Sequence, residues 1–138
     1  MLNQTIPLEL LNQQSATSMA GHLGIEITAI GDDYVCGKMP VDYRTHQPFG
    51  ILHGGASVVL AESLGSVGAN LAVDMNLYRC VGLEINANHV RSVRDGFVLG
   101  KATLSHAGKT TQIWDIRITD EAGKLVCISR LTIAVLAK

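Results

Sequence analysis

The sequence predicts an α+β fold in which an antiparallel sheet curls around one long buried helix. Residues 55–72 are apolar on almost every side, and a helix without a polar face has to be buried. Strand-like runs separated by short turns that contain glycine follow this helix, which is typical of antiparallel pairing. With 138 residues, 47% of them hydrophobic, the chain is long enough to bury a core, so we expect residues 1–138 to form a single domain.

Turn residues set the bounds of the other elements. We expect a short helix over residues 7–13, because proline is favoured in the first turn of a helix. Residues 23–30 and 34–39 form a hairpin, and a loop over residues 40–50 leads to the long helix. The strands after the helix are expected to form a meander, which leaves a free edge for pairing with a second copy of the chain. These strands cover residues 79–90, 97–105, 110–119 and 125–136.

Composition and charge exclude several classes of function. A net charge of −1 gives no electrostatic basis for binding nucleic acid or a membrane surface. The first residues lack the basic and apolar parts of a signal peptide, and three scattered cysteines fit reduced thiols in a cytoplasmic protein. The five histidines show no metal-ligand spacing, and the chain has neither a Walker loop nor a Rossmann fingerprint. We therefore expect no metal and no cofactor.

One carboxylate, Glu62, stands in the middle of the apolar helix. Burying a charge costs several kcal/mol unless a partner or a shifted pKa relieves it. Packing alone does not explain such a residue, so we expect Glu62 to act on a substrate. Ser66 follows four residues later, on the same face of the helix, where it can hold the carboxylate or a water molecule.

Three parts of the sequence together resemble the hotdog-fold acyl-CoA thioesterases. They are Gln47–Gly55, then Glu62 and Ser66, then Gly82–Arg91. Within that family the pattern is similar to the phenylacetate-pathway-like group, which includes 1,4-dihydroxy-2-naphthoyl-CoA thioesterases, and the resemblance covers residues 10–136. It implies a hotdog fold, hydrolysis of acyl-CoA thioesters with aromatic acyl groups, and a homodimer that often pairs into a tetramer.

The resemblance also implies a role for each residue of the catalytic set. Glu62 is the nucleophile or the general base, and the N–H of Gly54 polarises the thioester carbonyl. Gln47 and His53 line and orient the site, and Ser66 assists Glu62 or the attacking water. Elementary chemistry agrees, because a helix N-terminus offers free N–H groups and a dipole that favours developing negative charge.

The spacing between Gly54 and Glu62 predicts a homodimer. Eight residues along a helix span roughly 12 Å, whereas reacting atoms must approach to about 3–3.5 Å. One chain therefore does not readily supply both groups to the same thioester. Two antiparallel copies of the helix do, with Gly54 of one copy facing Glu62 of the other.

A second set of residues, made of basic side chains and a histidine near the end of the strand over residues 79–90, suits the phosphates of coenzyme A. Phosphate groups are bound preferentially by arginine and lysine. The resemblance favours His89 and Arg91, while Arg94 and Lys109, at the following turns, have an ordinary solvated strand end as their alternative explanation.

Other interpretations stay open at this point. The pair Gly54-Gly55 also fits a tight turn. His53 also fits a helix cap, and Ser66 also fits close packing between helices. A hotdog-fold acyl-thioester dehydratase or hydratase, or a non-catalytic acyl-CoA-binding protein, are the alternative functions. The acyl group is expected to lie among apolar side chains of the loop and helix: Phe49, Val59, Leu60, Leu64, Val67 and Leu71.

Overall fold

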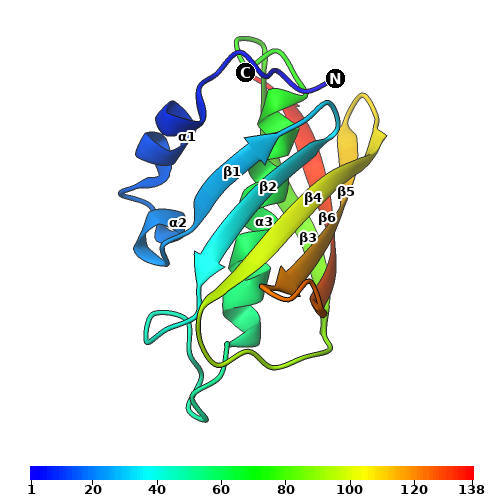
Figure 1. Ribbon diagram of the computed structural model, residues 1–138. Helices are drawn as coiled ribbons and strands as arrows, with labels where there is room; N and C mark the ends of the chain where they lie inside the picture. The colour runs from blue at the N-terminus through cyan, green and yellow to red at the C-terminus, as the bar shows by residue number, and fades with distance from the viewer.

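A long helix, α3 (Gly54–Leu71), lies in the hollow of a curled six-stranded antiparallel sheet (Figure 1). The computed structural model describes residues 1–138. Two short helices, α1 (Leu8–Ser15) and α2 (Met19–His22), stand beside the sheet. The strands are β1 (Glu26–Ile30), β2 (Tyr34–Pro40), β3 (Tyr78–His89), β4 (Phe97–Ala107), β5 (Thr111–Asp120) and β6 (Leu125–Ala137). This is the expected hotdog architecture, a sheet wrapped around one helix.

The order of the strands corrects the expected meander. The sheet runs β1-β2-β4-β5-β6-β3, so β4, β5 and β6 do form a meander, but β3 lies at the far edge, next to β6. The connection from β3 to β4 is too long for a tight hairpin and passes the start of α3, where Leu52 donates its N–H to the carbonyl of Val93 over 2.8 Å. β4 pairs instead with β2.

The core forms where one face of α3 meets the inner face of the sheet. Leu60 and Leu64 are fully buried there. Close packing near the C-terminal end depends on Gly68, because a Cβ at that position would collide with the indole ring of the buried Trp114. The ring nitrogen of Trp114 donates to the side-chain oxygen of Gln112 over 2.9 Å, and Gln112 donates to the carbonyl of Ala69 over 3.3 Å. The helix is thereby anchored to β5 at its C-terminal end.

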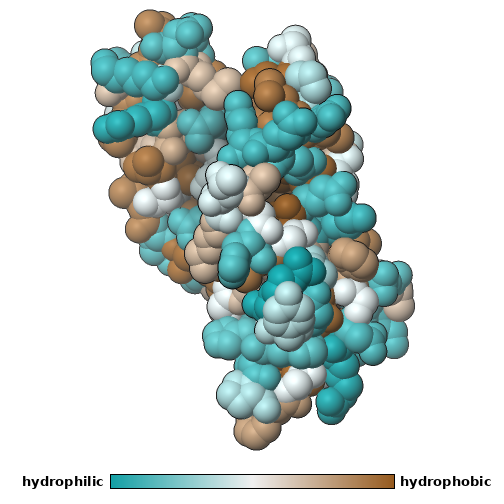
Figure 2. All heavy atoms as spheres, turned by 90° about the vertical axis from the view of Figure 1, so that its left-hand side faces the viewer, coloured by the Kyte–Doolittle hydropathy of each residue, from teal (hydrophilic) through white to brown (hydrophobic).

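The outer side of α3 is less covered than the sequence suggests. Val59, Glu62 and Ser66 are only half-buried, so the helix is not enclosed on every side within one chain. Figure 2 shows the side of the molecule that carries α1 and α2, where hydrophilic residues dominate and hydrophobic ones emerge in separate groups. No helix of the structure has the combination of length and apolar character needed to cross a membrane.

Candidate functional site

The N-terminus of α3 is capped by its own histidine. The Nδ1 of His53 accepts the N–H of Gly55 over 2.8 Å, and the carbonyl of His53 accepts the N–H groups of Ala56 and Ser57. None of these capping hydrogen bonds uses the N–H of Gly54. The first turn of a helix has N–H groups without intrahelical partners, so the Gly54 N–H remains for a ligand. His53 therefore does act as a helix cap, and its capping hydrogen bond leaves the N–H of Gly54 free.

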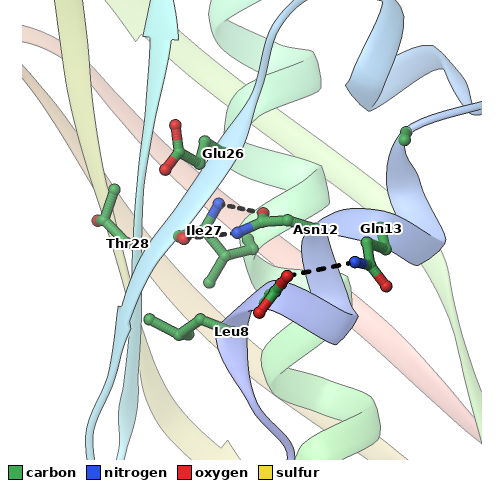
Figure 3. Close-up of a pocket in the computed structure, with 8 residues that line it drawn as sticks. Leu8, Asn12, Gln13, Glu26, Ile27 and Thr28 are labelled. Carbon is green, nitrogen blue, oxygen red and sulfur yellow. Dashed lines mark hydrogen bonds between the residues drawn. The ribbon is translucent and has the colours of Figure 1, made fainter.

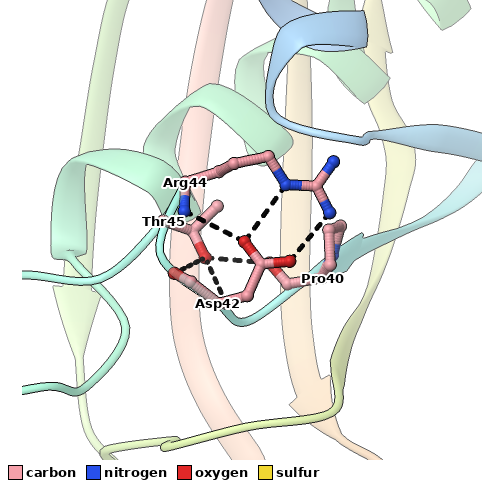
Figure 4. Close-up of polar contacts among 4 residues, drawn as sticks. All are labelled: Pro40, Asp42, Arg44 and Thr45. Atoms are coloured by element: carbon pink, nitrogen blue, oxygen red, sulfur yellow. Dashed lines mark hydrogen bonds and ion pairs between the residues drawn. The ribbon is translucent and has the colours of Figure 1, made fainter.

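A polar loop holds His53 in place. The guanidinium of Arg44 donates to both carboxylate oxygens of Asp42, over 3.1 and 2.8 Å (Figure 4). These hydrogen bonds lower the pKa of Asp42. The hydroxyl of Thr45 donates to the carbonyl of Pro40 over 2.9 Å, and the carbonyl of Thr45 accepts the N–H of His53 over 2.8 Å. The loop therefore holds the backbone of His53, and with it the start of α3, in place.

The last residue of β3 lies against the start of α3. A Cβ added at Gly54 would lie 2.7 Å from the Nε2 of His89. A glycine at position 54 therefore leaves room for the imidazole of His89 beside the backbone. The structure brings together His53, Gly54 and His89, which the sequence had placed in two separate sets.

The carboxylate of Glu62 lies two turns further along α3. It is half-buried, and none of the ion pairs in the structure includes it. Its Oε1 faces the backbone of Gly82 on β3 so closely that a Cβ there would collide with it. Glu62 also borders a cavity of ≈ 320 Å³, which is lined by Ser18, Met19, Ala20, Val59, Glu62 and Ser63. An unpaired carboxylate that reaches a cavity can attack a carbonyl carbon or take a proton from water.

Ser66 and Gln47 lie at the two ends of this region. Ser66, one turn beyond Glu62, lines a different cavity of ≈ 230 Å³ next to α1. Its backbone carbonyl accepts the side-chain amide of Asn70 over 2.9 Å. Gln47 is half-buried, and its side-chain oxygen accepts the N–H of Phe49, which closes its own loop.

The expected coenzyme A set is only partly assembled within one chain. Arg91 and Arg94 are exposed in the loop after β3, and the carbonyl of Arg94 interacts with the Nε2 of His46 over 2.8 Å. Lys109 lies instead in the β4–β5 turn, at the opposite end of the sheet (Figure 1). The expectation that Lys109 joins the other three is not met within one chain, because the β3–β4 loop and the β4–β5 turn lie at opposite ends of β4.

The apolar side chains expected around the acyl group divide into two groups. Leu60 and Leu64 are fully buried in the core against the sheet, and Leu71 is buried too but borders the cavity of ≈ 230 Å³ next to α1. Val59 and Val67 do line cavities on the open face of α3. Phe49 is 84% exposed in the loop. The difference follows from helix geometry, because only one face of α3 can pack on the sheet.

Sequence reasoning missed Met19 and the Asp42–Arg44 pair. Met19 belongs to a four-residue helix whose pattern is too short to reveal which face it presents. Asp42 and Arg44 stand two residues apart in a loop, and that spacing alone did not indicate a paired support for His53. No three histidine, cysteine, aspartate or glutamate side chains come together in a way that could hold a metal ion.

A larger cavity, of ≈ 640 Å³, lies between α1 and β1, away from these groups (Figure 3). There the side-chain amide of Asn12 donates to the carbonyl of Ile27 over 3.0 Å and accepts its N–H over 2.8 Å. The amide thus takes the place of a neighbouring strand on the free edge of β1. None of the expected catalytic residues lines this cavity, which we interpret as the seam between a helix and the sheet edge that it covers.

Comparisons with known proteins agree on one family. Residues 49–127 match the thioesterase superfamily. The 1,4-dihydroxy-2-naphthoyl-CoA hydrolase of Escherichia coli K12 is 55% identical over 131 residues, which cover 95% of this chain and 96% of the relative. The proofreading thioesterase EntH of Cronobacter turicensis is 50% identical over 130 residues, which cover 94% of this chain and 93% of the relative.

Solved structures give the same result. A mutant thioesterase from Pseudomonas aeruginosa is similar with a TM-score of 0.97 at 52% identity, and the similarity covers 99% of both chains. A thioesterase from Haemophilus influenzae has a TM-score of 0.95 at 49% identity, covering 99% of this chain and 94% of the other. These similarities therefore extend over α3, the loop before it and the whole sheet.

Proposed function

This chain belongs to the thioesterase superfamily and hydrolyses acyl-CoA thioesters, and we propose that its substrates carry aromatic acyl groups such as 1,4-dihydroxy-2-naphthoyl. We propose further that Glu62 and the N–H of Gly54 perform the reaction. One observation carries this proposal: α3 offers a free N–H at its start and an unpaired carboxylate beside a cavity two turns later. The similarity to a 1,4-dihydroxy-2-naphthoyl-CoA hydrolase supports the aromatic substrate.

In the proposed reaction the thioester oxygen accepts the Gly54 N–H. Negative charge develops on that oxygen as the carbonyl carbon is attacked, and a fixed donor at a helix N-terminus stabilises it. Glu62 acts by one of two routes. In the first, the carboxylate attacks the carbon, CoA leaves as a thiolate that takes a proton from solvent, and water hydrolyses the resulting anhydride. In the second, Glu62 takes a proton from water while the water oxygen attacks, and that proton passes to the leaving sulfur.

The two groups belong to different subunits in this proposal. Eight residues of one helix span roughly 12 Å, too far for a single thioester to bridge. Two contacts support the geometry of a dimer: Gly54 lies against His89, and Glu62 lies against Gly82. Strand β3 connects these two points along the free edge of the sheet. Antiparallel pairing of β3 with its copy brings the Gly82 region of one subunit to the His89 region of the other. Each site then takes Gly54 from one subunit and Glu62 from the other.

His53, Gln47 and Ser66 have supporting roles in this proposal. His53 keeps the N–H of Gly55 occupied and so fixes the direction of the first turn. Gln47 shapes the loop that borders the site, and Ser66 faces the same side of α3 as Glu62, where it can hold a water molecule. Arg91 and Arg94, with His89 beside them, form an exposed basic rim suited to the phosphates of CoA. Lys109 is left out of the rim because of its position.

Replacing Glu62 by glutamine tests the function directly. Free thiol release from benzoyl-CoA and 1,4-dihydroxy-2-naphthoyl-CoA is followed for the wild type, Glu62→Gln and the control Glu9→Gln, which changes an exposed glutamate on α1. We expect Glu62→Gln to lower kcat by about 10²–10⁴-fold, the usual contribution of a general acid or base, while Glu9→Gln keeps wild-type activity. Full activity in Glu62→Gln would refute the proposed role. A hydratase or dehydratase would leave the thioester intact and release no thiol.

A further inference from the structure

Two cavities on the open face of α3 meet at a single pair of side chains. One is the cavity of ≈ 320 Å³ that Glu62 borders. The other, also ≈ 320 Å³, borders His53 and Gly55 at the start of the helix. Met19 from α2 and Val59 from α3 line both cavities. These two side chains therefore form the boundary between them.

The spacing along α3 explains why the cavities follow one another. Gly55, Val59 and Glu62 stand at the intervals that place residues on one face of a helix. Residues of α2 line cavities together with this face, and at its edge the Glu62 carboxylate lies against Gly82 of β3. Because α2 has only four residues, it covers the helix at one place, and the space on either side stays open. At that place Met19 of α2 and Val59 of α3 line both cavities.

The geometry points to Met19 as the residue that limits the size of the acyl group. This inference rests on the proposed function, because it takes the thioester carbonyl to be bound at the Gly54 N–H. From that point the acyl group enters the cavity beside His53 and Gly55, whose apolar walls include Leu23, Ala56 and Val59. Met19 and Val59 close the far end. Acyl groups of compact shape, such as a single or fused aromatic ring, are therefore accepted, and long straight acyl chains are excluded.

The size of the cavity supports a compact acyl group. Pockets for small ligands usually measure roughly 300–1,000 Å³, and ≈ 320 Å³ lies at the lower end of that range. Without the Met19 side chain this cavity would continue into the one beside Glu62, so a longer chain would have somewhere to go. Met19 is 64% exposed, which leaves it few core contacts to lose when it is shortened. A flexible, polarisable methionine also suits a wall that must touch several acyl shapes.

Substrate preference measures the effect of Met19. The kcat/KM values for benzoyl-CoA and decanoyl-CoA are determined for the wild type, Met19→Ala and Met19→Phe, and the ratio of the two substrates is compared. We expect the wild type to prefer benzoyl-CoA and Met19→Ala to shift the ratio towards decanoyl-CoA by about tenfold or more, the scale on which apolar pockets discriminate. Met19→Phe keeps or strengthens the preference for benzoyl-CoA. An unchanged ratio in Met19→Ala would overturn the inference.

The control is Leu10→Ala, which shortens a partly exposed apolar residue on α1 that lines none of these cavities. Its ratio should equal that of the wild type, and a shift like that of Met19→Ala would mean that the effect does not come from the cavity. The ratio cancels any general loss of folded enzyme. If Glu62→Gln is inactive while the Met19→Ala ratio does not move, only the size limit is wrong. If Glu62→Gln stays active, the proposed role of Glu62 is wrong whatever the ratio does.

Discussion

The contact between Glu62 and Gly82 shows how one residue of a strand limits where a carboxylate of a helix can lie. Gly82 has no side chain, and the Glu62 carboxylate occupies the space that a Cβ would need. The strand bulges directly afterwards: its register with β6 shifts between Gly82 and Glu84, and Leu83 is 62% exposed. Bulges redirect side chains and often lie next to active sites. We therefore regard Gly82 as a positioning residue for Glu62.

Gly82→Ala should impair turnover more than substrate binding. The added methyl group collides with the Glu62 carboxylate, and the flexible end of that side chain has to move. A displacement of about 1 Å in a reacting group can cost about 10²-fold in rate, so we expect kcat to fall by about 10–100-fold with KM nearly unchanged. Steady-state kinetics with benzoyl-CoA measure both constants.

A double variant separates positioning from general damage. In the Glu62→Gln background the same Gly82→Ala change should have little further effect on kcat, because no catalytic carboxylate is left to displace. An equal loss in both backgrounds, together with a lowered unfolding midpoint, would show instead that Gly82 serves only the folding of β3.

At the scale of elements, α3 was predictable to within one residue, because its apolar composition is local information. The helix runs over Gly54–Leu71, against the expected residues 55–72. Its surroundings were not predictable in the same way. The number of strands and their approximate bounds follow from turn residues, but the place of β3 beside β6 depends on contacts between distant parts of the chain. The contacts of Gly54 with His89 and of Glu62 with Gly82 both depend on that placement.

The opposite ends of α3 are held by different means. The first turn depends on His53 and on the loop of Asp42 and Arg44, and it leaves a donor free. The last turns are fixed by the close packing of Gly68 on Trp114 and by the hydrogen bond from Gln112 to Ala69. A helix anchored at its C-terminal end keeps Glu62 at a constant distance from the sheet.

Gly68→Ala tests that anchor, and two effects of opposite sign compete in it. Alanine is favoured over glycine inside a helix by about 1 kcal/mol. The new methyl group, however, collides with the ring of Trp114, which is fully buried and has no room to move. Overpacking a core costs about 1–3 kcal/mol, so we expect a net loss of stability in chemical denaturation. Ser63→Ala, on the open face of the same helix, should be neutral or slightly stabilising. A Gly68→Ala protein as stable as the wild type would show that the ring can yield.

At the scale of the whole molecule, the features left unsatisfied in one chain gather on one side. Strand β3 has no partner on its outer edge, and Val81, Leu83 and Val90 are exposed along or just after it. Exposed edges of this kind are usually covered, because they invite pairing with another strand. The Glu62 carboxylate lies against the same strand. A dimer formed through β3 would cover the edge and complete the two proposed active sites at once. The spacing of Gly54 and Glu62 predicts a dimer from the sequence, but the strand through which it pairs depends on the place of β3 at the edge of the sheet.

The same contacts predict a register for this proposed dimer. When a strand pairs antiparallel with its own copy, the two-fold axis passes through a residue that then lies opposite its counterpart, and an axis at Asn86 places His89 of one copy opposite Leu83 of the other, next to Gly82. The two Asn86 Cα atoms are then about 4.5–5.5 Å apart, within the range that a disulfide bridges. The two Asn88 Cα atoms, on the same face of the strand, are about 14 Å apart.

Asn86→Cys should therefore form a covalent dimer under mild oxidation, and Asn88→Cys should not. Both side chains are exposed, so neither change disturbs the core. The native cysteines do not interfere, because Cys80 and Cys127 are buried and Cys36 lies on β2, far across the sheet from β3. Non-reducing electrophoresis distinguishes the two variants, and thiol release from benzoyl-CoA shows whether the linked dimer keeps its activity. Linkage through Asn88→Cys but not Asn86→Cys would mean a different register. A monomer in sedimentation that retains full activity would exclude the shared site, because one helix cannot bring Gly54 and Glu62 to the same carbonyl group.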